Sequence, residues 1–188
     1  VLSESMRSIR TNMEFMIPDL KSKVYSFTST IGSEGKTFIS TNIGALHAMA
    51  GKKVIVLDLD LRRPKVHLAF GQDAGTFGMS TLLISKHKLE NCLVKTEIEN
   101  LEYIPAGPVP PNPSELLLRS EFDALLKELK ARYDLILLDT PPIGLVTDGL
   151  LAMQKADLPI YVIKADYSRL SFINNINRLD NTGRYPNL

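Results

Sequence analysis

The chain has 188 residues, of which 44% are hydrophobic and 23% are charged, proportions that suit a single globular domain with a buried core. With 22 basic and 21 acidic residues, the whole molecule carries no field that would attract nucleic acid or anionic lipid, and we expect no nucleic-acid partner. The single cysteine excludes an internal disulfide, and no apolar run approaches the roughly 20 residues that cross a bilayer. A reducing cytoplasm is therefore the expected setting.

The first predicted element is a helix over residues 2–16, which ends before Pro18 because a helix interior does not accept proline. At about 100° per residue, one narrow stripe of this helix is apolar and consists of Leu2, Met6, Ile9 and Met13. Glu4, Arg7 and Arg10 lie on another flank of the helix. From composition alone, the simplest interpretation of these charges is a solvated face.

A phosphate-binding loop is predicted next, where a strand leads through small residues into a helix, so that backbone amides converge on phosphate oxygens. Gly35 allows close approach of the backbone, Lys36 reaches the β and γ phosphates, and the Thr37 hydroxyl ligates magnesium. The predicted nucleotide-binding residues are Gly32, Ser33, Glu34, Gly35, Lys36, Thr37 and Phe38. Thr30 stands where the GxxxxGK[ST] pattern has its first glycine, so a plain strand-to-helix turn is the alternative.

A buried strand over residues 53–60 brings Asp58 and Asp60 to its C-terminal end, on one face because strand side chains alternate. Two neighbouring carboxylates repel each other and are costly to bury unless a cation or hydrogen bonds lie between them. These aspartates are therefore candidates for metal binding and catalysis. The alternative is a structural pair that is salt-bridged to Arg62 and Arg63, which follow directly.

Residues 61–119 are the least regular part of the chain and are rich in Gly and Pro. A segment of this kind inside a compact domain usually carries function or covers a site. The helix that follows, over residues 121–132, should be capped by Ser120, with Asp123 at the capping-box position. Its apolar face is predicted to lie in the core and consists of Phe122, Leu125, Leu126 and Leu129.

Strands and helices alternate along the chain, and the apolar runs VIVL and LILL are continuous, as in strands that are buried on both faces. We therefore predict an α/β fold with a mainly parallel central sheet flanked by helices. The remaining predicted elements are strands over 24–30, 101–106, 133–140 and 158–166 and a helix over 37–50. Asp139 ends one strand at the position of a magnesium-supporting carboxylate. Three strand ends thus converge at the carboxyl edge of the sheet, where such folds bind ligands, and this predicts a site for ATP and Mg²⁺.

Three segments resemble the Walker A, Walker A′ and Walker B motifs of the bacterial tyrosine kinases: SEGKTFISTN, LDLDLRRP and LLDTPP. A further segment resembles a linking segment of the same family, IPAGPVPPNPSELL, and the likeness covers nearly the whole chain. The family includes the Wzc-like and CapB-like proteins of polysaccharide export and belongs to the P-loop NTPases of the MinD/ParA-like superfamily. The resemblance implies an ATP- and Mg-dependent protein tyrosine autokinase that regulates the synthesis and export of capsular or extracellular polysaccharide.

The resemblance also implies roles for the residues at the site. Lys36 and Thr37 would bind ATP and magnesium, and Asp60 and Asp139 would complete the metal shell. Asp58 would accept the proton of the tyrosine hydroxyl. The residues alone leave Asp58 and Asp60 interchangeable as base or metal support, because phosphoryl transfer depends mostly on positioning and charge neutralisation.

Two positions bear on the choice among related activities. Arg62 is a catalytic candidate that would stabilise charge on the transferred phosphoryl group, with a structural ion pair as the alternative. Ile31 stands where the partition and positioning ATPases of the superfamily carry a second, signature lysine, which favours the kinase branch. The alternatives are a ParA/MinD-like ATPase that binds DNA or membrane as a dimer, and an ATP-binding assembly scaffold without useful chemistry.

The family uses an E-x-x-R-x-x-R helix to join subunits into a ring, so we expect homo-oligomerisation through Glu4, Arg7 and Arg10 in a helix within residues 1–17. Its phosphoacceptors are clustered tyrosines of a tail that is offered to a neighbouring subunit. This sequence has no such cluster, and the acceptors are expected beyond Leu188. Residues 1–188 would then be one kinase domain of a longer chain, at the inner face of the bacterial cell membrane. A membrane-spanning activator, or polysaccharide co-polymerase, would lie on the same chain or on a partner.

Overall fold

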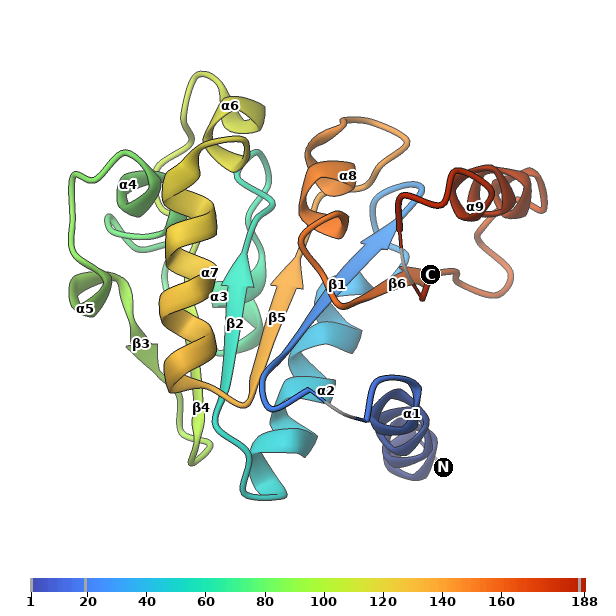
Figure 1. Ribbon diagram of the computed structural model, residues 1–188, viewed down its shortest axis with the longest axis horizontal. Coiled ribbons are helices and arrows are strands. Elements are labelled where there is room, and N and C mark those ends of the chain that lie inside the picture. The colour runs from blue at the N-terminus through green and yellow to red at the C-terminus, as the bar shows by residue number, and fades with distance from the viewer. Residues whose placement is uncertain (1, 19, 186) are drawn as a thin grey trace.

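Six strands form one sheet in the order β3-β4-β2-β5-β1-β6 (Figure 1). The structure is a computed structural model that describes residues 2–18, 20–185 and 187–188, except for the side chains of residues 2 and 3. The strands are β1 (Lys23–Ser29), β2 (Val54–Asp58), β3 (Val94–Lys95), β4 (Leu101–Ile104), β5 (Leu135–Asp139) and β6 (Leu158–Val162). All neighbouring strands are parallel except β3 and β4. The mainly parallel sheet predicted from the sequence is confirmed.

Helices cover both faces of this sheet, with α2 on one face and α7 on the other, while α9 lies beyond the β6 edge (Figure 1). Three of the helices have thirteen or more residues: α1 (Leu2–Met16), α2 (Lys36–Met49) and α7 (Ser120–Arg132). The shorter ones within the described residues are α3 (Val66–Ala69), α4 (Met79–Leu83), α5 (Leu89–Cys92), α6 (Pro113–Leu117), α8 (Asp148–Met153) and α9 (Ser171–Asp180). Four of these, α3 to α6, lie in the segment 61–119 that the sequence marks as irregular.

Each face of the sheet has its own hydrophobic core, and alternate residues of a strand enter opposite cores. In β2, Val54 and Val56 pack with α1 and α2 residues such as Met6 and Ile43, whereas Ile55 and Leu57 pack on the other face with residues of α7. All four predicted apolar residues of α7 are buried there. The continuous apolar runs therefore predict buried strands correctly, because both faces of this sheet are covered.

Several strands are shorter than predicted, for reasons that can be seen locally. β4 ends at Ile104, because Pro105 has no N–H to continue the ladder. β2 ends at Asp58, whose carboxylate accepts a hydrogen bond from the Asp60 amide and so turns the chain. β6 ends at Val162, and the residues after it fold back over the phosphate-binding loop.

The start of α7 differs from the prediction. Ser120 is the first residue of the helix, the N-cap is Arg119, and no side chain makes a capping hydrogen bond. The Ser120 hydroxyl instead donates to the Glu121 carboxylate. The predicted Ser120 cap and its Asp123 partner are wrong, because the chain becomes helical one residue earlier than the sequence signal suggests.

Helix α1 packs against α2 through only part of the predicted apolar stripe. Met6 and Met13 are buried, whereas Ile9 is 40% exposed. Leu2, the fourth predicted residue of the stripe, has its side chain outside the described residues. The Arg10 guanidinium adds a polar contact, since its Nη1 donates to the backbone oxygen of Leu46 at 3.1 Å.

Candidate active site

The loop between β1 and α2 has an open shape that suits phosphate. Ser33 and Gly35 have positive φ values of 66° and 97°, and Gly35 is the N-cap of α2. Apart from the adjoining residues of the chain, no atom lies within 4 Å of the point where a Cβ on Gly32 or Gly35 would stand, so the backbone is approachable there. Lys36 is the first residue of the helix and is buried. Free amides at a helix N-terminus beside a lysine form an anion-binding arrangement.

Glu34, one of the predicted nucleotide-binding residues, is held within the loop itself. Its side chain is buried, and Oε2 accepts a hydrogen bond from the Ile31 amide at 2.8 Å. Its other oxygen accepts a hydrogen bond from the hydroxyl of Ser168. Glu34 therefore shapes the loop, whereas Phe38, on the first turn of α2, is half exposed.

The segment after β6 also contacts the phosphate loop, and no sequence signal indicates this. The Tyr167 hydroxyl donates to the Gly32 backbone oxygen at 3.2 Å. The Lys164 ammonium donates to the Ser33 backbone oxygen at 3.5 Å and lies 4.9 Å from the centroid of the Tyr167 ring. Together with the Ser168 hydroxyl, these groups hold the outer side of the loop.

Asp139 lies directly opposite the start of α2. Its Oδ2 accepts a hydrogen bond of 2.6 Å from the Thr37 hydroxyl, and its Oδ1 accepts one of 3.4 Å from Ser40. The structure thus brings together two of the three predicted magnesium-binding residues. The contact of Ser40 with Asp139 was not predicted from the sequence, although Ser40 lies three positions after Thr37 and so on the same face of the helix.

Asp58 is the neighbour of Asp139 across the sheet, in register between β2 and β5. Its side chain is fully buried, and its oxygens accept hydrogen bonds from the amides of Asp60, Lys65 and Val66 at 3.0 to 3.2 Å. Asp60 keeps some exposed surface, and its Oδ1 accepts a hydrogen bond from the Arg63 amide at 3.0 Å. Backbone amides therefore compensate the buried Asp58 carboxylate and fix the course of the chain after β2.

The three carboxyl groups share one electrostatic environment. Burial, together with the charge of Asp139, raises the pKa of Asp58 well above its usual range. Burial also raises the pKa of Asp139 to about 6, although Lys36 acts in the opposite direction. The pKa of Asp60 is raised by burial as well. A cation placed among these groups would lower all three pKa values, because it favours the ionised form of each.

Comparison with known proteins assigns the family. A family model described as "AAA domain" matches residues 22–184. The chain is 37% identical over 170 residues to the putative tyrosine-protein kinase CapB of Staphylococcus aureus, a match that covers 90% of this chain and 74% of that protein. This chain belongs to the bacterial tyrosine-protein kinases. It is also 38% identical over 163 residues to the tyrosine-protein kinase YwqD of Bacillus subtilis, covering 87% of this chain and 68% of that one.

Solved structures agree with this assignment. The kinase domain of Escherichia coli tyrosine kinase ETK matches with a TM-score of 0.90 and 30% identity, over 96% of this chain and 71% of that one. The chimerical protein CapA2B2 matches with a TM-score of 0.89 and 32% identity, over 96% and 80%. The septum site-determining protein MinD of Pyrococcus horikoshii, complexed with Mg-ADP, matches with a TM-score of 0.71 and 25% identity, over 87% and 67%. The predicted P-loop NTPase fold and the predicted kinase family are confirmed.

Among the helices that the structure describes, none is long and apolar enough to span a bilayer. The kinase also matches the wzc protein of Salmonella typhimurium at 35% identity over 181 residues, but spans only 25% of that much longer relative.

The residues of this kinase site fit a magnesium ion that is shared with nucleotide phosphates. Thr37, Asp60 and Asp139 offer a hydroxyl and two carboxylates, which are the hard oxygen donors that Mg²⁺ prefers. Within the described residues, no group of three or more His, Cys, Asp or Glu side chains is arranged to hold a metal by itself. Magnesium usually keeps water and substrate phosphates among its ligands, so the protein needs to supply only some of the donors.

Arg62 is engaged in the structural ion pair that the sequence analysis offers as an alternative. Its Nε lies 3.1 Å from Oδ2 of Asp148, a buried residue at the start of α8. The other Asp148 oxygen accepts a hydrogen bond from Ser114. Neither Asp58 nor Asp60 forms an ion pair with Arg62. The alternative in which these two aspartates are salt-bridged to it is therefore wrong, because the partner of Arg62 is Asp148.

The three predicted oligomerisation residues of the kinase are not equivalent. Glu4 and Arg7 are exposed and form an ion pair of 3.8 Å with each other. Arg10 is half-buried and holds Leu46 of α2, so it contributes to the fold of a single chain. The helix therefore presents Glu4 and Arg7 most openly.

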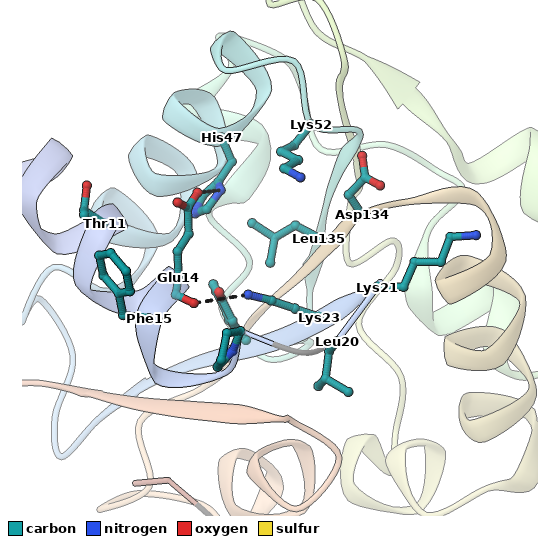
Figure 2. Close-up of a pocket in the computed structure, with 12 residues that line it drawn as sticks. Thr11, Glu14, Phe15, Leu20, Lys21, Lys23, His47, Lys52, Asp134 and Leu135 are labelled. Atoms are coloured by element: carbon teal, nitrogen blue, oxygen red, sulfur yellow. Dashed lines mark hydrogen bonds and ion pairs between the residues drawn. The ribbon is translucent and has the colours of Figure 1, made fainter.

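A hollow lies at the amino-terminal edge of the sheet, and Figure 2 shows residues that line it. It has a volume of about 380 Å³ and lies between the end of α1, the end of α2 and the starts of β1 and β5. In Figure 2, Lys23 donates to the Glu14 backbone oxygen, and the Glu14 carboxylate lies beside His47. The Lys23 Nζ to Glu14 oxygen distance is 3.4 Å, and the His47 Nδ1 to Glu14 Oε1 distance is 3.5 Å. Burial, reinforced by Arg10 and two lysines, lowers the pKa of His47 to about 4, so this contact joins a neutral imidazole to Glu14. The hollow is a gap between α1 and the sheet, and none of the predicted site residues line it.

Proposed function

We propose that this chain is an ATP- and magnesium-dependent protein tyrosine autokinase that regulates capsular or extracellular polysaccharide synthesis and export. One observation carries the proposal: Thr37 and Asp139 are joined by a hydrogen bond of 2.6 Å beside the phosphate loop, with Asp58 in register on the neighbouring strand. This places a phosphate-binding helix end, a magnesium-binding pair and a candidate base at one edge of the sheet. The family assignment selects tyrosine phosphorylation among the reactions that such a site can support.

In the proposed mechanism, the loop amides and Lys36 bind and orient the β and γ phosphates. Thr37, Asp60 and Asp139 would hold magnesium, whose charge would neutralise the phosphates. The Thr37 hydroxyl, which donates to Asp139, would be one of the oxygen donors that hold the ion. Burial of these carboxyls favours catalysis because charges interact more strongly where water is excluded.

Asp58 is the proposed acceptor of the tyrosine hydroxyl proton. Burial raises its pKa, and a carboxylate with a raised pKa is a better base near neutral pH. Three backbone amides orient the group, so it needs no reorganisation when the substrate arrives. Asp60, which retains exposed surface, is the proposed metal ligand of the pair.

Assembly is part of the proposal. The exposed Glu4 and Arg7, with Arg10, would join copies of this chain into a ring-like oligomer. A membrane-spanning activator on the same chain or on a partner would place the domain at the inner face of the bacterial membrane. A tyrosine-rich tail of a neighbouring subunit would then be a substrate. The similarity to the CapA2B2 chimera and to a much longer wzc protein supports association with further segments or partners.

The catalytic claim is tested by incubating the chain with labelled ATP, magnesium and a tyrosine-containing peptide, and measuring phosphotyrosine. Lys36→Met should abolish the product, whereas Lys127→Met on the exposed face of α7 should leave it unchanged. Asp58→Asn should lower turnover with nucleotide binding retained, and Asp60→Asn should raise the magnesium concentration that is required. Label that persists in Lys36→Met would contradict the proposal.

A further inference from the structure

The six tyrosines of this chain differ sharply in their exposure. All six lie within the described residues, and four of them are buried: Tyr25, Tyr103, Tyr133 and Tyr185. Tyr161 is half-buried, and its hydroxyl is hydrogen-bonded to Thr30. Tyr167 is the exception, with 45% of its surface exposed. Only this tyrosine presents an accessible hydroxyl-bearing ring to another molecule.

Tyr167 also has a defined position at the nucleotide site. It lies in the turn after β6, next to Asp166, which has a positive φ of 58°. A hydrogen bond of 2.9 Å from the Lys164 amide to the Ser168 hydroxyl closes this turn. Its own hydroxyl donates to the Gly32 backbone oxygen at 3.2 Å. The exposed tyrosine is therefore fixed against the phosphate loop.

We propose that Tyr167 is an autophosphorylation site, modified by a second copy of this chain, and that its phosphorylation weakens ATP binding by the copy that carries it. The inference rests on the proposed kinase function. A phosphate loop turns its amides towards the bound phosphates. Tyr167 contacts a carbonyl oxygen of that loop, so its hydroxyl lies on the outer side, with the loop between it and its own nucleotide. Transfer from a neighbouring copy avoids this obstacle.

The reaction balances without any further reagent. The Tyr167 oxygen forms a bond to the γ phosphorus of the neighbour's ATP, and the bond from that phosphorus to the β–γ bridging oxygen breaks. ADP leaves with the bridging oxygen, and the hydroxyl proton passes to the neighbour's Asp58 carboxylate and then to water. No oxidation occurs.

The consequence for the modified copy follows from the contacts that it loses. Phosphotyrosine no longer has the hydroxyl donor that contacts the Gly32 oxygen, and its dianion is repelled by that carbonyl. Lys164, whose ammonium already lies 4.9 Å from the ring centroid, is the nearby cation that the phosphate would attract. Lys164 would then leave the Ser33 oxygen, so the phosphate loop loses two of its outer contacts and gains a nearby negative charge.

The test mixes two variants of the full 188-residue chain. The donor carries Tyr167→Phe and keeps Lys36, and the acceptor carries Lys36→Met and keeps Tyr167. After incubation with ATP and magnesium, mass spectrometry should find phosphate on Tyr167 of the acceptor and none on its buried tyrosines. An acceptor with both Lys36→Met and Tyr167→Phe is the matched control and should remain unmodified.

A tyrosine-containing peptide in the same reaction separates the two possible failures. If the peptide is phosphorylated while the Tyr167 segment is recovered unmodified, the Tyr167 assignment is wrong and the kinase function stands. If neither is phosphorylated, although the donor is folded and binds ATP, both claims fail. For the effect on binding, phosphorylated chain should bind a non-hydrolysable ATP analogue about tenfold more weakly than the same chain after phosphatase treatment. Equal affinities would overturn the inhibitory part of the proposal.

Discussion

Asp139 shows how one buried carboxyl can serve both the fold and a magnesium site. Its side chain is 1% exposed at the end of β5, and hydroxyl groups of Thr37 and Ser40 donate to it. Loss of hydration outweighs these hydrogen bonds and the attraction of Lys36, so its pKa rises to about 6. The ionised form that binds a metal is thus disfavoured until the metal is present.

This raised pKa predicts a pH-dependent difference between the nucleotide-free chain and Asp139→Asn. Between pH 3.8 and about 6, the folded state holds a proton on Asp139 that the unfolded state has lost. Its contribution to the free energy of unfolding is therefore present below this range and is lost as pH rises through it. The stability of the chain relative to Asp139→Asn should fall over this interval and then level off. Urea unfolding of both proteins at several pH values measures it, and a constant difference would show that the pKa is not raised.

At the scale of elements, the segment between β6 and α9 supports the phosphate loop. The Ser168 hydroxyl donates to the buried Glu34 carboxylate, which in turn accepts the Ile31 amide. Since Glu34 has little exposed surface, the loss of one partner leaves a buried charge less compensated. The loop should then populate conformations that are less suited to phosphate.

Ser168→Ala should therefore weaken the binding of a magnesium–ATP analogue by about tenfold, the effect of losing roughly 1.5 kcal/mol from a hydrogen bond to a charged group. Ser171→Ala, at an exposed position three residues further along, is the matched control and should bind like the original chain. Titration calorimetry measures both affinities. Equal affinity for the Ser168 variant would mean that this contact does not position the loop.

Helix α1 leads to a second prediction at this scale, because its charged residues have different surroundings. Arg10→Ala should lower the free energy of unfolding by about 1 kcal/mol, since it removes the hydrogen bond to the Leu46 oxygen. Arg7→Ala should change it by less than about 0.5 kcal/mol, because its pair with Glu4 is exposed. Both substitutions should reduce the assembled mass measured by light scattering. Loss of assembly only together with loss of stability would contradict a direct role of this helix in the interface.

The elements also show which parts of the structure the sequence can predict. β2 and β5 are predictable because an apolar run followed by an aspartate is a local signal. The helices α3 to α6 are not, since four or five residues are too few to establish a helical period. The contact between Ser168 and Glu34 joins residues 134 positions apart, and neither carries a motif that would indicate the other. The motif residues were thus found, while the groups that hold them in place were not.

At the scale of the whole molecule, the candidate site lies at the carboxyl ends of the strands that separate the two hydrophobic cores. β2 and β5 each contribute alternate residues to both cores and end at Asp58 and Asp139. Ligand contacts at these strand ends are therefore coupled to the packing of both faces. Burial of the carboxyls, together with repulsion among them, lowers the stability of the chain without nucleotide, as their raised pKa values indicate.

Magnesium and a non-hydrolysable ATP analogue should consequently stabilise the entire domain. At a ligand concentration of about 100 Kd, binding to the folded state alone adds roughly 2.7 kcal/mol to the free energy of unfolding. Lys36→Met should lose most of this gain, whereas Lys127→Met, which changes an exposed lysine of α7, should keep it. Chelation of magnesium should lower the gain in the unmodified chain, because the carboxyls at the strand ends then face the phosphates without a cation between them. Thermal unfolding of the three proteins with and without ligand measures these shifts. A shift of equal size in Lys36→Met, or one that is indifferent to magnesium, would place the nucleotide somewhere other than at this edge of the sheet.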